Sequence, residues 1–139
     1  MHNLFIEMAE TKQKKVLVAE DDPSMAEIVA HKLTTSGFSV RHASDGKLAL
    51  EMFNQETPDI ILLDLMMPEM DGFQVLEVIR KDPDKKKAAT PVIVLSNLWS
   101  NEDILKAKSL KADDYMVKAY FTTEEILNKI NALLHINHL

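Results

Sequence analysis

Short apolar runs alternate with longer amphipathic stretches along most of the chain, and this alternation restricts the possible folds more than any other feature. The apolar runs are rich in Val, Ile and Leu and occupy Val16–Ala19, Phe38–Ala43, Ile60–Leu63, Val92–Leu95 and Tyr115–Val117. Several of them are apolar at every position, which is typical of parallel strands that are covered on both faces. The runs therefore predict five strands of one buried sheet.

The stretches between these runs have helical spacing. The clearest apolar stripe is the last one, formed by Ile126, Leu127, Ile130, Leu133 and Leu134. A similar stripe is formed by Val75, Leu76 and Ile79, and another by Met25, Ile28, Val29 and Leu33. Residues at this spacing share one face of a helix, so each stretch predicts a helix packed on the sheet.

Local signals mark where the helices begin and end. Asp22 before Pro23 is a typical N-cap followed by proline at the first helical position. Gly37 follows the first stripe at a position that favours a left-handed residue, and Thr122 or Thr123 with Glu125 predicts a cap for the last helix. We interpret the charged run 81–87 as a solvated loop.

The order is therefore strand then helix, five times over. Parallel strands joined by right-handed helical crossovers give an α/β fold, a three-layer α/β/α sandwich with a five-stranded parallel sheet and five helices. The chain has 139 residues, which suits one domain. We expect residues 1–12 to be a flexible tail and residues 13–139 to form the domain.

Charge and composition exclude several classes of function. The formal net charge is −6, which argues against direct binding to nucleic acid or to an anionic membrane surface. There is no cysteine, so disulfides and thiolate chemistry are excluded and a cytoplasmic location is the simplest expectation. No apolar run approaches the roughly 20 residues that span a bilayer, and the first ten residues do not resemble a signal peptide.

Polar side chains follow four of the five predicted strands directly. Glu20 and Asp21 come after the first strand, Asp64 after the third, Ser96 at the end of the fourth, and Lys118 after the fifth. Ligands of an open parallel sheet bind outside the carboxyl ends of its strands, so we expect these side chains to converge.

This set of groups suits a magnesium site next to a nucleophile. Carboxylates held close together repel one another unless a proton or a cation intervenes, and Mg²⁺ prefers oxygen ligands. Asp64 could then attack a phosphoryl group and form an acyl phosphate. Lys118 and the Ser96 hydroxyl could bind the transferred oxygens.

At this point the chain closely resembles the receiver domains of two-component response regulators, from about Lys14 to about Ile136. The resemblance is carried by four segments, Val16–Asp22, Asp59–Gly72, Pro91–Ser96 and Ala112–Lys118. It implies the flavodoxin-like strand order 2-1-3-4-5.

The resemblance also implies roles for individual residues. Asp64 would be the phosphoacceptor, Asp21 would bind Mg²⁺ directly, and Glu20 would do so mostly through water. The backbone carbonyl of Met66 would supply another metal ligand. Asp22 is better interpreted as a helix cap than as a ligand.

Three further roles concern the response to phosphorylation. Ser96 would be the hydroxyl that moves toward the phosphoryl group, Lys118 would pair with that group, and Tyr115 would be the aromatic residue that turns inward.

Three positions depart from the family pattern. Ala119 replaces the usual proline after Lys118, and because a cis bond before alanine costs roughly 3–4 kcal/mol we expect this bond to be trans. Asn97 occupies a position that is mostly small and apolar in the family. Trp99 lies in a loop that is normally hydrated, where it could anchor a partner or pack over the loop.

The favoured function is a stand-alone response regulator that receives a phosphoryl group from a histidine kinase or a phosphotransfer protein. It would signal through phosphorylation-dependent protein binding or phosphorelay, as a monomer or weak dimer and not as an enzyme. One alternative is a Mg²⁺-dependent phosphohydrolase, but Met66 stands where such enzymes usually carry their second acid. The other is a receiver-like scaffold that is not phosphorylated.

Overall fold

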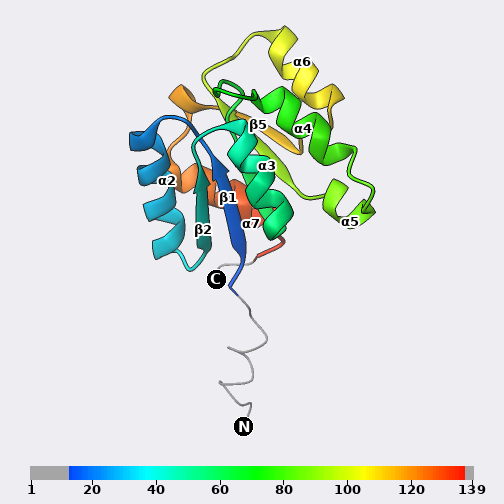
Figure 1. The fold of residues 1–139 in the computed structure, drawn as a ribbon. Helices are drawn as coiled ribbons and strands as arrows, with labels where there is room; N and C mark the ends of the chain where they lie inside the picture. Colours follow the sequence, from blue (N-terminus) through cyan, green and yellow to red (C-terminus); the bar gives the residue numbers. More distant parts are fainter. Residues whose placement is uncertain (1–12, 137–139) are drawn as a thin grey trace.

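The computed structural model describes residues 13–136, and the predicted tail at residues 1–12 lies outside this range. The elements, labelled as in Figure 1, are β1 (Lys15–Ala19), α2 (Pro23–Thr35), β2 (Ser39–Ala43), α3 (Gly46–Gln55), β3 (Ile60–Leu63), α4 (Gly72–Arg80), α5 (Lys85–Ala88), β4 (Val92–Ser96), α6 (Asn101–Ser109), β5 (Asp114–Val117), the 3-10 turn η1 (Lys118–Tyr120) and α7 (Thr123–Leu133).

The five strands form one parallel sheet in the order β2-β1-β3-β4-β5. The strand order reverses at β1, which pairs with β2 on one side and with β3 on the other. In this register Ala19 lies beside Ala43 on one side and beside Leu63 on the other. The strands β1 and β3 therefore end at the same level, which aligns the residues that follow them.

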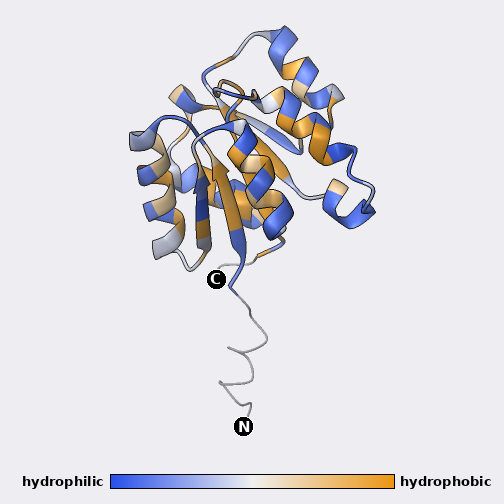
Figure 2. Ribbon diagram, in the orientation of Figure 1, coloured by the Kyte–Doolittle hydropathy of each residue, from blue (hydrophilic) through white to orange (hydrophobic). Residues whose placement is uncertain are grey.

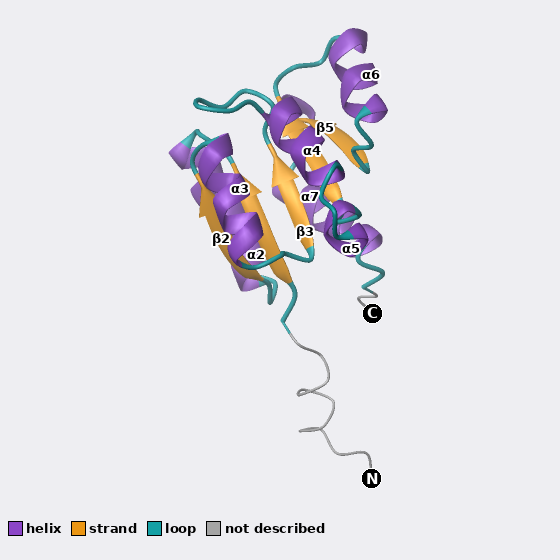
Figure 3. Ribbon diagram, turned by 45° about the vertical axis from the view of Figure 1, so that its right-hand side comes forward, coloured by secondary structure: helices purple, strands orange, loops and turns teal. Residues whose placement is uncertain are grey.

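Two apolar layers bury the faces of the sheet. Val16 and Val18 point to the face covered by α2 and α7, whereas Leu17 and Ala19 point to the face covered by α3 and α4. On the α4 side, Ala107 of α6 packs in a smaller cluster beside β4. Figure 3 shows α3 and α4 in front of the sheet, and Figure 2 shows the apolar colour of the inner strand β1. The predicted three-layer sandwich is confirmed.

The structure corrects the predicted helix count. Residues 13–136 contain six α-helices where five were expected, because the run 81–87 includes the start of the short helix α5. The Asp84 carboxylate caps this helix by accepting hydrogen bonds from the N–H groups of Lys86 and Lys87 at 2.9 and 3.3 Å. A solvated loop was therefore the wrong interpretation of the second half of this run.

The predicted caps are present. Asp22 accepts from the N–H groups of Ser24 and Met25 at the start of α2, and Thr122 forms a capping box with Glu125 at the start of α7. Gly37, directly after the C-cap of α2, has φ of +100°, as expected for a left-handed residue at this position.

One residue of a predicted stripe is not in the core. Ile28 of α2 is 55% exposed, whereas Ala26, Val29 and Leu33 of the same helix are buried. The buried face of α2 is thus narrower than the apolar pattern indicated.

No helix within residues 13–136 is long and apolar enough to cross a membrane.

Candidate functional site

The predicted site residues converge at the carboxyl ends of the strands. The Asp64 N–H donates to the carbonyl of Ala19 at 3.0 Å, and the Glu20 N–H donates to the carbonyl of Ala43 at 2.9 Å. The sheet ladder therefore continues for one residue beyond the strands. These backbone bonds hold the two carboxylate side chains side by side.

Glu20, Asp21 and Asp64 form a three-carboxylate cluster. Each residue offers an oxygen, and these oxygens lie within 4.8 Å of one another. Glu20 and Asp64 are buried, at 3% and 5% exposure, whereas Asp21 is exposed. One exposed carboxylate and two buried ones would leave room in the coordination sphere for the water molecules that Mg²⁺ keeps.

A buried polar atom in this cluster has no partner. The Oε2 atom of Glu20 is buried and has no hydrogen bond. Leaving such an acceptor unsatisfied is costly, and a bound cation or its water ligand would satisfy it. The three acids thus fit a hard divalent ion.

Lys118 is directed into the same cluster from the turn η1. Its Nζ atom lies 2.9 Å from Oδ2 of Asp64 and also donates to Oε1 of Glu20. All peptide bonds within residues 13–136 are trans, so the bond between Lys118 and Ala119 is trans as predicted. The ammonium group reaches Asp64 from this backbone.

Burial and the lysine separate the ionisation of the two buried acids. Burial, together with the neighbouring Asp64, raises the pKa of Glu20 to about 8. Burial alone would also raise the pKa of Asp64, but hydrogen bonds with Glu20 and Lys118 outweigh it and lower that pKa. Asp64 therefore stays a carboxylate, which is the form that a nucleophile requires.

The loop after β3 is held tightly against Asp64. The Met66 N–H donates to Oδ1 of Asp64 at 3.2 Å, and the Gly72 N–H donates to the carbonyl of Leu65 at 3.0 Å. A Cβ atom at Gly72 would lie 2.2 Å from the carbonyl oxygen of Asp64. Only glycine fits this approach. Gly72 stands in the segment that carries the resemblance, but no sequence pattern predicted a role for this glycine itself.

Ser96 and Tyr115 both contact the loop between β4 and α6. Ser96 is fully buried, and its Oγ accepts from the Leu98 N–H at 3.3 Å. The Tyr115 hydroxyl donates to the Leu98 carbonyl at 2.7 Å. The two predicted switch residues are therefore linked through one backbone unit, and this link was not foreseen.

Trp99, one residue further along the loop, does not pack over it. Its exposed fraction is 70%. Leu98 instead packs partly against the small cluster around Leu65 and Val94. Of the two alternatives that the sequence left open for Trp99, local packing is wrong.

The arrangement supplies the parts that phosphoryl transfer to a carboxylate requires. It has an ionised carboxylate at Asp64, an ammonium group 2.9 Å from that carboxylate, and two further acids that could hold a cation. Positive charge on both sides of the nucleophile would stabilise the charge of a phosphoryl group.

Comparisons with known proteins agree on one family. The family model described as the response regulator receiver domain matches residues 16–131. A protein of Guillardia theta named probable transcriptional regulator ycf27 is 42% identical over 125 residues, which cover 90% of this chain and 46% of that protein. The chain thus spans about half the length of the curated relatives it matches.

Solved structures give the same result. The receiver domain of the Francisella response regulator 1452 matches with a TM-score of 0.80 and 36% identity, covering 88% of this chain and 98% of that one. The Mn²⁺-bound form of the response regulator Rcp1 matches with a TM-score of 0.76 and 28% identity, covering 91% and 98% of the two chains.

Proposed function

Because the chain belongs to the family of response regulator receiver domains, we propose that it is a phosphorylation switch in which Asp64 accepts the phosphoryl group. The observation that carries this proposal is the position of Asp64, a buried carboxylate with a lowered pKa beside two acids and an ammonium group. The donor would be a histidine kinase or a phosphotransfer protein.

In the transfer, a carboxylate oxygen of Asp64 attacks the phosphorus atom. A P–O bond forms to Asp64, the P–N bond of a phosphohistidine donor breaks, and the electron pair returns to the imidazole, which takes up a proton. Lys118 binds an oxygen of the incoming group, because its ammonium already lies beside Asp64. The Ser96 hydroxyl moves toward another oxygen, and Tyr115 follows through the shared contact with Leu98.

Mg²⁺ is the proposed cofactor. Asp21 and Asp64 would bind it directly, with Glu20 acting mostly through water and the Met66 carbonyl as a further ligand. When bound, the ion neutralises part of the negative charge of the carboxylates and the phosphoryl group. The Mn²⁺-bound form of Rcp1 supports a divalent ion in a protein of this fold.

The output is proposed to be phosphorylation-dependent protein binding or phosphorelay in the cytoplasm. The relative from Guillardia theta is about twice as long and is named as a transcriptional regulator, so control of transcription is the competing output. Hydrolysis of outside substrates is disfavoured, because the Met66 side chain has no proton to donate to a leaving group.

The experiment uses acetyl phosphate with Mg²⁺ and intact-mass measurement. The wild-type chain is expected to gain one phosphoryl group, and Asp64→Asn to gain none. Asp22→Asn is the matched control, because Asp22 only caps α2 and should leave labelling unchanged. Equal labelling of Asp64→Asn and the wild type would refute the proposal.

A further inference from the structure

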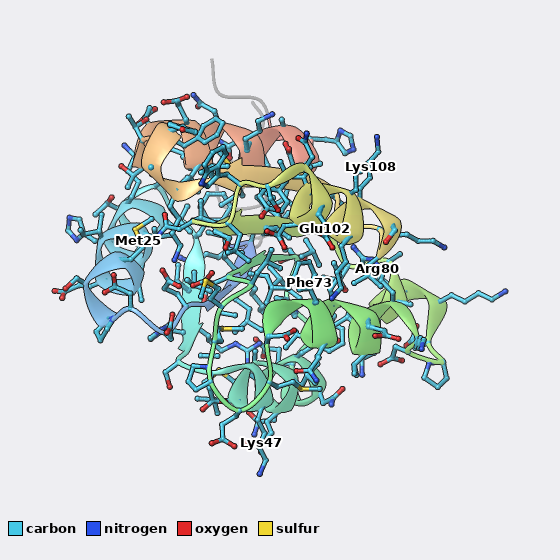
Figure 4. All side chains as sticks on the ribbon, turned by 90° about the horizontal axis from the view of Figure 1, so that it is seen from above. Met25, Lys47, Phe73, Arg80, Glu102 and Lys108 are labelled. Atoms are coloured by element: carbon cyan, nitrogen blue, oxygen red, sulfur yellow. The ribbon has the colours of Figure 1, made fainter. Side chains whose placement is uncertain are left out.

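Two adjoining hollows lie beside the phosphoacceptor pocket. One, of about 480 Å³, is lined by Met66 and Phe73, and the other, of about 370 Å³, is lined by Trp99. Leu98 lines both hollows, so they form one continuous surface. We call the surface formed by Met66, Phe73, Leu98 and Trp99 the rim groove. Figure 4 labels Phe73 on α4 and Glu102 on α6, the two helices that border it.

The rim groove exposes large apolar side chains. Met66 is 58% exposed and Trp99 is 70% exposed. A single exposed apolar residue such as Ile28 is ordinary on a protein surface. Two that share adjoining hollows make a patch that can hold the side chains of another molecule. Trp and Met are also enriched where proteins bind partners.

The charges around the rim groove are mostly acidic, with one cation, Lys106 of α6, whose Nζ lies 4.3 Å from the centroid of the Phe73 ring. Asp21 and Asp71 line the larger hollow, and Asp103 lines the smaller one. The residues that line the two hollows include no Lys or Arg. Within residues 13–136, none of these three acids forms a salt bridge, so their charge is free to act on a partner.

We propose that the rim groove binds a cationic amphipathic segment of a partner protein. The apolar face of the segment contacts Met66, Leu98 and Trp99, and its basic residues face the surrounding acids. Charge complementarity of this kind selects the partner and orients it. When a cation occupies the carboxylate cluster, Asp21 is neutralised and Asp71 and Asp103 still carry the attraction.

The rim groove adjoins the proposed Mg²⁺ site, because Asp21 and Met66 line its larger hollow, but its apolar contacts take no part in the chemistry at Asp64. A segment seated in the rim groove would lie over Met66, whose N–H is bonded to the Asp64 carboxylate. Binding there does not require a phosphoryl group, so it can be measured without a phosphodonor. Failure of this proposal therefore leaves the phosphoacceptor role untouched, and the reverse also holds.

The test uses a designed probe with the whole chain. The probe is a labelled helical peptide of roughly 18 residues, five turns, with Leu on one face and Arg on the other. A second peptide carries Glu in place of Arg. Fluorescence anisotropy should show binding of the cationic peptide only, and the emission of Trp99 should shift to shorter wavelength as the indole leaves water.

Three variants locate the binding site. Trp99→Ser should weaken binding of the cationic peptide about tenfold, because a buried Trp anchor dominates an interface. Asp103→Asn should weaken it about threefold, since one attractive charge is lost. Ile28→Ser is the matched control, because it removes another exposed apolar residue, from α2, and should leave the affinity unchanged.

Two outcomes would overturn the proposal. One is equal binding of the cationic and anionic peptides. The other is an unchanged affinity of Trp99→Ser, or a loss in Ile28→Ser as large as in Trp99→Ser, either of which places the peptide elsewhere. Circular dichroism of each variant ensures that the comparison is made between folded proteins.

Discussion

Arg80 at the end of α4 is expected to be one of the largest polar contributors to stability. Its Nη1 donates to the carbonyls of Ala88 and Thr90 at 2.8 and 2.7 Å. Its Nε and Nη2 both donate to the carbonyl of Lys111, and Nη2 also lies 3.0 Å from the Asp113 carboxylate. One side chain thus joins α4, the end of α5 with the segment that follows it, and the loop before β5.

The magnitude follows from these contacts. The Arg80 side chain is only 13% exposed, and hydrogen bonds to a charged group are worth about 1.5–3 kcal/mol each. The sum of these hydrogen-bond energies overstates the loss, because Ala88 and Lys111 border a hollow of about 450 Å³, where water can replace part of the guanidinium. We therefore expect Arg80→Ala to lower the free energy of unfolding by about 3 kcal/mol.

Urea unfolding measures this change. With a slope of roughly 2 kcal/mol per molar, the midpoint should fall by about 1.5 M. Arg80→Lys should recover less than about half of the lost free energy of unfolding, because a single ammonium group cannot reproduce the planar set of N–H donors of the guanidinium. Lys81→Ala is the control on the same helix end. Its pair with Glu77 is exposed and screened by solvent, so this change should leave the urea midpoint almost unchanged. A loss below about 1 kcal/mol in Arg80→Ala, or full recovery in Arg80→Lys, would refute this reasoning.

Three more predictions concern the site. Mg²⁺ should raise the melting temperature of the wild type and much less that of Asp64→Asn, as seen by calorimetry with Mg²⁺ or EDTA; no shift in the wild type would exclude the metal site. Gly72→Ala should lower the free energy of unfolding by about 1–3 kcal/mol, because its Cβ would overlap the Asp64 carbonyl; an unchanged urea midpoint would show that the loop accommodates the methyl group. Burial raises the pKa of Tyr115 from 10.0 to about 12, and the negative charges of Asp103 and Asp64 add to the shift. The stability that the neutral hydroxyl contributes is therefore complete below pH 10 and is lost as the pH rises toward 12. Between pH 9 and 11 the wild type should therefore lose more stability than Tyr115→Phe, and equal losses would contradict the shift.

The strands were predictable because both faces of the sheet are covered. A strand that is buried on both sides must be apolar at consecutive positions, and Ile60–Leu63 has the same bounds in the sequence pattern and in the structure. The other strands differ by a single residue at an end, as for Ser96, which extends β4. These continuous apolar runs were sufficient to locate the strands, because they are too short to form typical helices.

The helices were less predictable, because the apolar pattern does not determine how wide a buried stripe is and cannot reveal a very short helix. Apolar spacing shows which side of α2 is buried but not how wide the buried stripe is, so Ile28 was placed in the core and is exposed. The helix α5 has four residues and none of them is buried, so it has no apolar stripe from which a helix could be predicted. Its only local signal is the cap at Asp84.

The identity of the site residues followed from their places at strand ends, but their interactions did not. Position predicted that Glu20, Asp64 and Lys118 would meet. Burial decides that Glu20 has a raised pKa and that its Oε2 has no hydrogen bond, and burial depends on the whole packed structure. The 70% exposure of Trp99 likewise depends on how far the neighbouring helices extend.

The contact between Lys118 and Glu20 joins residues that are 98 positions apart. The pocket is therefore among the last parts of the described domain that a growing chain can complete. A ribosome-bound chain that has not yet released β5 and η1 holds three acids without their lysine, and α7 is not there to cover Ile60 and Ile93. Under the proposed function, a chain that ends before Lys118 lacks one of the positive charges that would bind the phosphoryl group.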